Sequence, residues 1–513
     1  MLEIDLAQTF YKLAGDIMPS LPVSRRAFIN LSVSAIASLS IPRLGFAQAT
    51  PRIRLEWQEF KTTPQYASFI DAVGKMKANT QQGSPSSWAY WTNVHVNTCP
   101  HDVAYFLAWH RGYLYYLEQQ LRIVSGDSTL NLPYWNYYQY PTIPAEFTDP
   151  TQGNPLYMPR AGTSVYNALT LAPFADNVWN FQRGTLNAFE PKLESGPHNP
   201  VHNLIGGEMA NMTSPRDPIF YLHHANIDRL WHAWALPDGK GIPGTSNPYN
   251  ALTSNPYWAG SFTYAPGLTM QRCKTYYPPW LNFDYSDNAK PTSLPMAARA
   301  QSDDRNMLVQ AQAVPMLTRP AAGNFAATSA QVVTPTRRAL GGVVGVVLTE
   351  MPVSAHLPLT GSSLQSLQDA LAAAVSPPAR IPPGTFQSVV VVLDKLQLLG
   401  DGAKGGYFYN VYINLPYVTD ADRARKYLLG TVGPFEVAGA SRQNPAKLEF
   451  QATEVMSRFS TFELQNVTVS LVRISGDKSP RGGVLKLGEV RIEISTARPW
   501  DPSPPAKREH CYC

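Results

Sequence analysis

The spacing of apolar residues divides this chain into a helical first half and a strand-rich second half. Between residues 50 and 286, apolar positions recur at helical spacing in pieces that alternate with Pro-, Asn- and Gly-rich loops, such as 136–165 and 236–262. From about residue 341, apolar and polar positions alternate in short runs bounded by Gly and Pro, which predicts strands. Several such runs at this spacing favour an antiparallel sandwich or a small barrel. They are VVGVVLTEM (343–351), SVVVVLDKLQLL (388–399), GYFYNVYINLP (406–416), KLEFQATEV (447–455), NVTVSLVRIS (466–475) and GEVRIEIS (488–495).

The composition between the two halves marks a connecting segment. Residues 287 to about 340 are rich in Ala, Thr, Ser and Pro and contain few aromatics, which is typical of a linker. We therefore predict a mainly α domain over 50–286, a linker over 287–340, a β-sandwich-like domain over 341–497 and a tail over 498–513. Near the end of the tail, His510, Cys511 and Cys513 offer ligands for Cu(I), or thiols for intermolecular disulfides.

The first 49 residues have the order of a secretory signal peptide. SRRAFIN at 24–30 contains a twin-arginine pair, an apolar stretch follows over 31–41, and Ala47-Gln48-Ala49 forms a small-x-small cleavage site. We expect export by the Tat pathway to a periplasmic or secreted location. The alternative is a short buried helix. The apolar stretch is too short to span a bilayer, so no membrane anchor is expected.

The composition excludes a disordered or fibrous protein. Charged residues make up 15% of the 513 residues, hydrophobic residues 44% and aromatics 11%. The net charge of +5 is small for this length, and no basic run is longer than a pair, so nucleic acid is not an expected partner. Four cysteines are too few for a disulfide scaffold.

Histidine is distributed very unevenly, and this points to a metal. Of ten histidines, eight lie between His95 and His232. His101 and His110 would face opposite sides of one straight helix, because nine steps of about 100° amount to two and a half turns. We therefore expect His101 before a helix or at its start, His110 inside that helix, and His95 in a loop or at the end of a preceding helix.

A second group of histidines has clearer helical spacing. His198 and His202 are four residues apart, which places both imidazoles on one helix face. The adjacent His223 and His224 follow a predicted helix start in which Asp217 caps and a proline occupies the first turn. Asp228 lies one turn after His224, where a carboxylate can accept the ring N–H of a histidine ligand.

The types of side chain in these groups favour copper. Imidazole suits copper, zinc, iron and nickel, but binuclear zinc hydrolases normally include bridging carboxylates, and the chain has no HExxH or paired CxxC motif. Two clusters that each offer three neutral histidines favour a pair of copper ions that act with dioxygen. His232 and His356 are interpreted as ordinary core or surface residues.

Three segments resemble the type 3 copper family, which includes tyrosinases, catechol oxidases and haemocyanins. FLAWHRGYLYYLE, PHNPVHNLIGG and SPRDPIFYLHHANIDRLWHAW are similar to the family's FLPWHRxYLxxFE, HNxVHxxxGG and SPxDPxFxxHHxxxDRxW. The resemblance covers about 50–286 and implies a four-helix bundle that holds two copper ions. It implies His95, His101 and His110 as ligands of one copper and His198, His202 and His224 as ligands of the other, with His223 as a neighbour. Along the chain, His95 lies closer to His101 than the first ligand lies to the second in many family members.

The resemblance also implies roles for residues next to the ligands. Cys99 fits a thioether to His101, and its alternative is a small buried apolar side chain. Glu194 and Asn199 resemble the pair that holds a water for deprotonating an incoming phenol. A phenol has a pKa near 10 and must lose its proton before it binds copper. Their presence favours monophenol hydroxylation over catechol oxidation alone.

Further positions are expected to shape the site. Asn203 and Met212 would lie near the entrance, and Phe220 one turn below His224 against the copper site. The Phe-Asp-Tyr sequence at 283–285 resembles the mark that closes the family's catalytic domain, and Arg52 or Arg54 is expected to stack on it.

The β-rich domain resembles the C-terminal domain of plant and some bacterial polyphenol oxidases, which shields the copper cleft. An aromatic of the GYFYNVYINLP run would then plug the entrance, with Tyr407, Phe408 and Tyr409 as candidates, and ordinary strand packing is the alternative. The leading function is oxidation of small phenols to o-quinones with O2. The alternatives are catechol oxidation only, haemocyanin-like O2 binding and, least favoured, zinc hydrolysis.

Overall fold

The computed structural model describes residues 51–101, 103–235, 256–296, 312–313, 318–319, 336–376, 381–416, 421–442 and 445–499. All of them belong to one compact unit of the chain, Pro51–Cys513. The predicted signal peptide at 1–49, most of the linker and the His510, Cys511 and Cys513 group lie outside the described residues.

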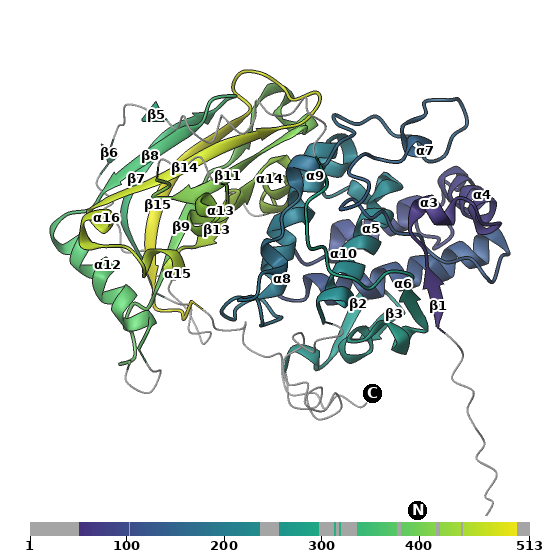
Figure 1. Cartoon of the computed structure of the whole chain (residues 1–513), viewed down its shortest axis with the longest axis horizontal. Coiled ribbons are helices and arrows are strands. Elements are labelled where there is room, and N and C mark those ends of the chain that lie inside the picture. Colours follow the sequence, from purple (N-terminus) through teal and green to yellow (C-terminus); the bar gives the residue numbers. More distant parts are fainter. Residues whose placement is uncertain are drawn as a thin grey trace, which may run out of the picture. The chain divides into compact units, whose positions relative to one another are not determined.

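The first part of the unit is built from helices, drawn purple to teal in Figure 1. Its main helices are α4 (Gln65–Ala78), α5 (Trp88–Thr98), α6 (Phe106–Ser125), α9 (Asn199–Ile205) and α10 (Ile219–Ala235), with the short helices α3 (Trp57–Phe60), α7 (Ala145–Thr148) and α8 (Phe189–Leu193). Short helical turns accompany them, among them η3 (Glu194–His198), η4 (Gly207–Ala210), η5 (Ser214–Arg216) and η7 (Arg272–Thr275).

The helices form because apolar residues recur on one face and meet in a common core. In α4, Phe69, Ala72, Val73 and Met76 are buried, which is the spacing of an amphipathic helix. Almost every residue of α10 is buried, so this helix runs through the centre of the helical part. As predicted, Asp217 caps α10, since its Oδ1 accepts a hydrogen bond from the Ile219 N–H at 3.1 Å.

Two short strands close the helical part. β1 (Arg52–Arg54) pairs in parallel with β4 (Phe283–Tyr285), which joins the start of this part to its end. The Arg54 guanidinium lies 3.7 Å from the centre of the Phe283 ring. Arg54 is therefore the arginine that stacks on the Phe-Asp-Tyr sequence. A hairpin of β2 (Ser261–Ala265) and β3 (Leu268–Gln271) lies in the same part.

The second part is a pair of mainly antiparallel sheets, as the alternating pattern predicts. One sheet has the order β13-β9-β15-β7-β6 with β10 beside β15, and the other has the order β12-β11-β14-β8-β5. The strands are β5 (Gln312–Ala313), β6 (Thr318–Arg319), β7 (Arg337–Leu348), β8 (Val353–Pro358), β9 (Ser388–Asp394), β10 (Gln397–Leu398), β11 (Tyr407–Ile413), β12 (Leu428–Val432), β13 (Lys447–Gln451), β14 (Asn466–Ser475) and β15 (Leu485–Ser495). They are drawn green to yellow in Figure 1.

Residues from both sheets share one core. Val389, Val391 and Leu393 of β9 alternate into the same buried cluster as Val411 of β11 and Leu471 of β14. Several helices accompany the sheets, and the strand pattern did not predict them: α12 (Gly361–Ala374), α13 (Ala421–Ala424), α14 (Pro434–Ala440), α15 (Thr453–Met456) and α16 (Thr461–Gln465). The expectation of a helical domain followed by a sheet-rich domain is confirmed.

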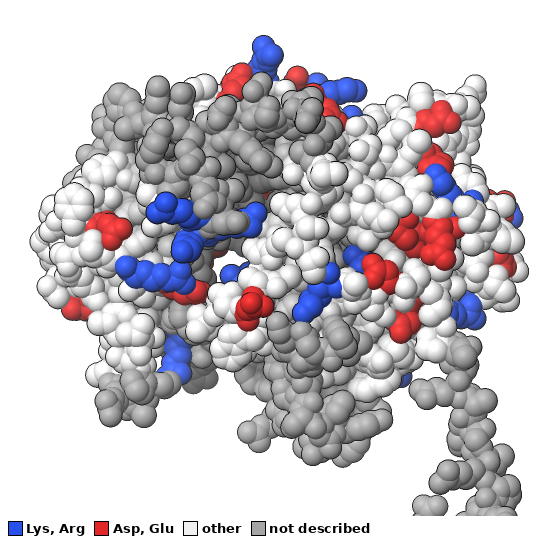
Figure 2. All heavy atoms as spheres, viewed as in Figure 1, with Lys and Arg blue, Asp and Glu red and all other residues white. Residues whose placement is uncertain are grey.

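Charged side chains of both signs are visible on the face of the molecule that Figure 2 shows. On this face, Lys and Arg lie beside Asp and Glu between wide uncharged areas.

Within the described part of the chain, no helix combines the length and the apolar character that crossing a bilayer requires.

Candidate metal centre

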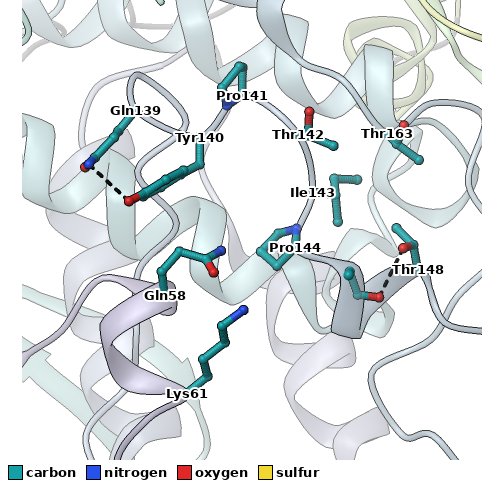
Figure 3. A pocket seen from close by; sticks show the side chains of 11 residues that line it. Gln58, Lys61, Gln139, Tyr140, Pro141, Thr142, Ile143, Pro144, Thr148 and Thr163 are labelled. Carbon is teal, nitrogen blue, oxygen red and sulfur yellow. Dashed lines mark hydrogen bonds between the residues drawn. The ribbon is translucent and has the colours of Figure 1, made fainter.

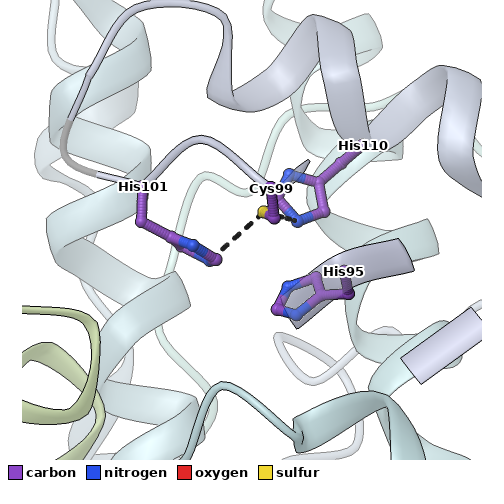
Figure 4. A group of neighbouring side chains, drawn as sticks. All are labelled: His95, Cys99, His101 and His110. Atoms are coloured by element: carbon purple, nitrogen blue, oxygen red, sulfur yellow. Dashed lines mark hydrogen bonds between the residues drawn. The ribbon is translucent and has the colours of Figure 1, made fainter. Parts of the chain in front are cut away.

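The first histidine cluster forms where two helices meet (Figure 4). His95 lies in the last turn of α5, and Cys99 ends that helix. His101 lies in the loop between α5 and α6, and His110 lies inside α6, as the spacing predicted. The three imidazole centres form a nearly equilateral triangle with sides of 5.3, 5.8 and 5.7 Å.

The second cluster comes from α9 and α10. His198 precedes the first residue of α9, His202 lies within it, and His223 and His224 come from α10. The Nε2 atom of His224 lies 3.2 Å from that of His198 and 3.2 Å from that of His202. Three imidazole nitrogens about 2 Å from one metal ion would be separated by roughly this distance. The three nitrogens therefore converge as ligands of a single ion do.

The two clusters lie against each other. The His110 and His224 rings are stacked, with centres 4.3 Å apart and planes inclined by 22°. The four ligand-bearing helices, α5, α6, α9 and α10, thus bring both triplets together in one buried place. Ligand atoms within each cluster all lie within 4.8 Å of one another. This geometry fits two metal ions as near neighbours.

Backbone and side-chain oxygens fix the ring orientation of four of the six histidines. In each of the four, the Nδ1 atom contacts an oxygen that can only accept, so Nδ1 carries the proton and Nε2 keeps its lone pair for a metal. The contacts are His95 to Met212 O at 2.9 Å, His110 to Phe106 O at 2.7 Å, His202 to Met209 O at 2.7 Å and His198 to Asn199 Oδ1 at 2.7 Å. The Nε2 atom of His95 is buried and has no hydrogen-bond partner in the described structure, as a metal ligand requires.

Burial also keeps these imidazoles neutral. Removal from water lowers the pKa of His110 to about 3, and burial together with the neighbouring imidazoles lowers the pKa of His101, His198 and His224 well below the usual value. A neutral imidazole is the form that binds a metal. The copper ligands would therefore need no proton removed at neutral pH.

This shift gives the metal-free protein a definite pH dependence. The folded His110 stays neutral between pH 6.5 and about 3, whereas the unfolded residue takes up a proton below pH 6.5, so the free energy of unfolding falls as pH falls through this window. For His110 alone we expect a loss of about 2 kcal/mol between pH 7 and pH 5. Urea unfolding in a chelator at both pH values measures it. In His110→Gln the pH effect should be smaller by that amount, and an equal effect in both proteins would contradict the assignment.

Cys99 lies between two of the first three histidines. Its Sγ atom is 3.3 Å from His110 Nε2 and 3.7 Å from His101 Nε2. It is a buried free thiol, and burial raises its pKa, whereas Cys273 is disulfide-bonded. The thioether to His101 stays a prediction.

His223 adds a fourth imidazole to the second cluster. Its ring is stacked 5.2 Å from that of His198, and neither ring nitrogen has a hydrogen-bond partner in the described structure. By contrast, His232 and His356 belong to neither of the two histidine clusters.

Glu194 and Asn199 both lie close to the second cluster, but their side chains have partners of their own. The Glu194 carboxylate is buried and forms an ion pair with Arg183. The Asn199 Oδ1 atom accepts the Nδ1 proton of His198. Asn199 therefore positions a ligand, and the predicted shared water remains a prediction.

Phe220 lies where the sequence places it. Its ring centre is 4.1 Å from that of His224, 5.1 Å from that of His95 and 5.9 Å from that of His202, so it contacts both clusters. Met212 orients His95 through its carbonyl, and its side chain lies against Gly439 of α14.

The prediction that Asp228 orients His224 is wrong. Asp228 Oδ1 accepts a hydrogen bond from Arg111 Nε at 2.6 Å, and Oδ2 accepts one from the Tyr285 hydroxyl at 2.5 Å. Arg54 Nη1 lies 3.7 Å from Asp228 Oδ2, while His224 Nδ1 has no hydrogen-bond partner in the described structure. The carboxylate turns toward Arg111 of α6 because an unpaired guanidinium would be costly in this buried place. Since Arg111 follows His110 and Asp228 lies one turn after His224, this pair ties together the two helices that carry them.

Replacing Asp228 by asparagine should therefore destabilise the protein strongly. The isosteric change leaves the buried Arg111 without its counter-charge, which costs about 3–5 kcal/mol in the free energy of unfolding, whereas Arg54 keeps its ion pair with Glu118. Urea unfolding of the metal-free protein measures the loss. The matched control is Asp71→Asn, which breaks an exposed pair with Lys75 on α4 and should cost less than about 1 kcal/mol. Equal losses in the two variants would contradict a structural role for the buried pair.

The β-rich part contributes a ring to the site, but not one of the three predicted. Tyr407 and Tyr409 lie in the core between the two sheets, and Phe408 packs into the core of the helical part. The ring over the histidines is Phe435 of α14, stacked on His202 with centres 4.0 Å apart and planes inclined by 14°. Alternation along β11 buries all three predicted aromatics, so none of them is left to reach the site.

Several polar contacts hold the two parts together around Phe435. Asn203 is the main contact: its Nδ2 donates to Glu436 Oε2 at 2.7 Å, its Oδ1 accepts from the Phe435 N–H at 2.9 Å, and its carbonyl accepts from the Gly406 N–H at 2.7 Å. Gly206 ends α9 with φ +68°, and a Cβ there would lie 2.5 Å from the Lys404 carbonyl oxygen. The first glycine of the pair that ends the PHNPVHNLIGG segment thus permits the close approach of the β-rich part.

A surface hollow of about 600 Å³ lies elsewhere in the helical part (Figure 3). Its lining includes Gln58, Lys61, Gln139 and Tyr140, and Gln139 Nε2 donates to the Tyr140 hydroxyl at 3.1 Å. None of its lining residues belongs to either histidine cluster. The candidate centre is therefore the buried pair of clusters and not this hollow.

Known proteins share the segments that carry these histidines. Residues 70–188 and 148–236 match the family described as the common central domain of tyrosinase. Tyrosinase HcTyr1 of Hahella sp. is 36% identical over 215 residues, which cover 35% of this chain and 46% of that protein. A tyrosinase-like protein of Diaporthe leptostromiformis is 28% identical over 250 residues, or 38% of this chain and 66% of that protein. The matches to these two relatives thus span less than two thirds of their length.

A third relative is matched over a larger share of its length. The tyrosinase of Streptomyces glaucescens is 31% identical over 186 residues, which cover 28% of this chain and 67% of that protein. Among solved structures, that of latent apple tyrosinase aligns with 87% of this chain and 98% of its own at 19% identity and a TM-score of 0.48. The segments that match the family model contain all six of the converging histidines. The chain belongs to the tyrosinase family.

Proposed function

We propose that this protein oxidises phenols to o-quinones with O2 at two copper ions held in the bundle of α5, α6, α9 and α10. His95, His101 and His110 would hold one copper, and His198, His202 and His224 the other. The carrying observation is the pair of all-histidine triplets, five of whose six members are buried, in contact through His110 and His224. Neutral nitrogen donors without a carboxylate suit copper, so the residues present fit the metal.

Bound copper would supply the electron transfer between the phenol and O2. The protein's own groups hold the imidazoles in one tautomer through the Met212, Phe106 and Met209 carbonyls and Asn199, and they exclude water through Phe220. In this proposal Glu194 and the Asn199 amide hold the water that accepts the phenolic proton. Hydroxylation combines one phenol, one O2, two protons and two electrons from a reductant into one o-diphenol and one water. Oxidation converts two o-diphenols and one O2 into two o-quinones and two waters.

We also propose that the full chain is latent, because Phe435 covers the site. Its ring is 2% exposed and lies on His202, with the His101 and His198 centres 5.4 and 5.7 Å away. A phenol ring cannot lie on His202 while Phe435 is there, because two rings cannot share one volume. Displacing the β-rich part, or cutting the chain within the predicted linker over 287–340, should therefore open the site.

The test is oxygen uptake by the copper-loaded full chain before and after limited proteolysis, with tyrosine and L-DOPA as substrates. Oxidation of both supports the full proposal, and oxidation of L-DOPA alone limits it to catechol oxidation and removes the role of Glu194. Reversible O2 binding with no turnover of either would replace the enzyme by an oxygen carrier. Equal rates before and after proteolysis would refute latency.

A further inference from the structure

The contact between Phe435 and the site has the form of a bound ligand. The ring lies flat on His202, while the main-chain N–H of the same residue donates to Asn203 Oδ1 at 2.9 Å. Nitrogen, Cα, Cβ and ring together form an N-acylated 2-arylethylamine. Two neighbouring residues of α9, His202 and Asn203, thus recognise two ends of one small skeleton.

The polypeptide around Phe435 is also accommodated closely. A Cβ on Gly433 would lie 2.5 Å from Asn203 Cγ, so only glycine permits this approach of the main chain. Glu436 Oε2 accepts from both Asn203 Nδ2 at 2.7 Å and the Gly433 N–H at 3.0 Å. The Asn203 side chain therefore meets a glycine, an aromatic residue and an acidic residue in the order Gly-Pro-Phe-Glu.

The residues that make this contact are all buried in the closed chain. Asn203 is 0% exposed, Phe435 2% and Glu436 4%. When the β-rich part leaves, the Asn203 amide loses an N–H donor at Oδ1 and a carboxylate acceptor at Nδ2. A ligand that restores only the ring contact covers the Asn203 amide but gives neither Oδ1 nor Nδ2 a hydrogen-bond partner. Covering an amide without a partner costs free energy.

We propose that the opened site takes aromatic rings carried on a polypeptide, and that Asn203 selects them by accepting the main-chain N–H of the aromatic residue. The preferred substrate class is then a tyrosyl side chain within a peptide, or an N-acylated arylethylamine, over phenols of equal size without an N–H. This inference rests on the proposed phenol oxidation and adds its substrate class. Asn203 is the residue that determines the specificity.

The first experiment compares two matched phenols on the opened, copper-loaded full chain. N-acetyltyramine carries the N–H, and 2-(4-hydroxyphenyl)ethyl acetate has oxygen in its place. We expect kcat/KM to favour the amide by about tenfold, the effect of one hydrogen bond in a buried site. Asn203→Leu should bring the ratio to about one, and Asn203→Asp, which keeps an acceptor, should preserve it. Asn93→Leu, on the exposed side of α5, is the control and should keep the unsubstituted protein's ratio.

The outcomes separate this inference from the function on which it rests. Oxidation of 4-methylcatechol with a ratio near one in the unsubstituted protein overturns the inference and leaves phenol oxidation standing. No oxidation of 4-methylcatechol, tyrosine or L-DOPA overturns both.

A second experiment needs no opened site and does not depend on how Asn203 variants fold. In the copper-loaded full chain, Phe435→Tyr places a phenol where the ring lies on His202. With O2 and with ascorbate as the reductant, the side chain at position 435 should gain one oxygen atom as one water forms. The rate constant of this change should not depend on protein concentration, because the reaction occurs within one chain. Mass spectrometry of the peptide, with copper-free protein as the control, detects the change. The variant is also opened by proteolysis and tested with N-acetyltyramine. If it oxidises that phenol but its own side chain at position 435 stays unmodified, the ring of Phe435 does not occupy the position of a substrate.

Discussion

Replacing His224 by alanine should remove the second copper and lower phenol oxidation by at least about a thousandfold. His224 is the ligand whose Nε2 atom lies 3.2 Å from both of the other converging nitrogens, so its loss leaves two donors where a copper ion needs three. The copper content, measured by elemental analysis, should fall by about half while the first cluster keeps its ion.

The control for this prediction lies on the same helix. His232 is buried in α10, two turns beyond His224, and belongs to neither cluster. His232→Ala removes an imidazole of the same helix and should keep both copper ions, even if it lowers the melting temperature. Full copper content in His224→Ala, or an equal loss in His232→Ala, would refute the ligand assignment.

Replacing Phe435 by alanine should activate the full chain without proteolysis. Removal of the ring opens the space on His202, and we expect oxidation of 4-methylcatechol to rise by about 10- to 100-fold, a change in the activation free energy of about 1.4–3 kcal/mol. The same change removes a buried ring, so the free energy of unfolding should fall by about 3–5 kcal/mol. Oxygen uptake per bound copper separates the two effects.

Phe408→Ala is the matched comparison, because Phe408 is as buried as Phe435 and was predicted from the sequence as a plug. Its ring packs into the helical core, so its loss should destabilise the protein without opening the site. Activation by Phe408→Ala but not by Phe435→Ala would reverse the assignment.

The sequence sufficed for the ligands because their information is local. Spacing alone placed His101 outside α6 and His110 within it, and the family motifs added the grouping into two triplets. The strands were predictable for the same reason, since alternation is a property of neighbouring residues. Helix α14 was not predicted, because it is only seven residues long and begins at Pro434 directly after Gly433, and a Gly-Pro pair is typical of a turn.

Contacts between distant residues could not be predicted in this way. The helical spacing that puts Asp228 one turn from His224 is real, yet its carboxylate serves Arg111 and Tyr285, which lie far from it in the chain. Likewise, all three aromatics of β11 fit an entrance plug by type, but the sheet register buries them, and α14 carries Phe435 to His202 instead.

The sequence by itself therefore determined the class of the site: two sets of histidines on helices, neutral donors suited to copper, and a sheet-rich domain after them. The tertiary structure alone decided which aromatic ring covers the site, which oxygens orient four of the imidazoles, and that Asn203 joins the two parts of the molecule. The physical reason is that ligand spacing is fixed by helical geometry within a few residues. The direction of a side chain such as Asp228 or Asn203 is instead fixed by which buried charge or donor most needs a partner once the chain has folded.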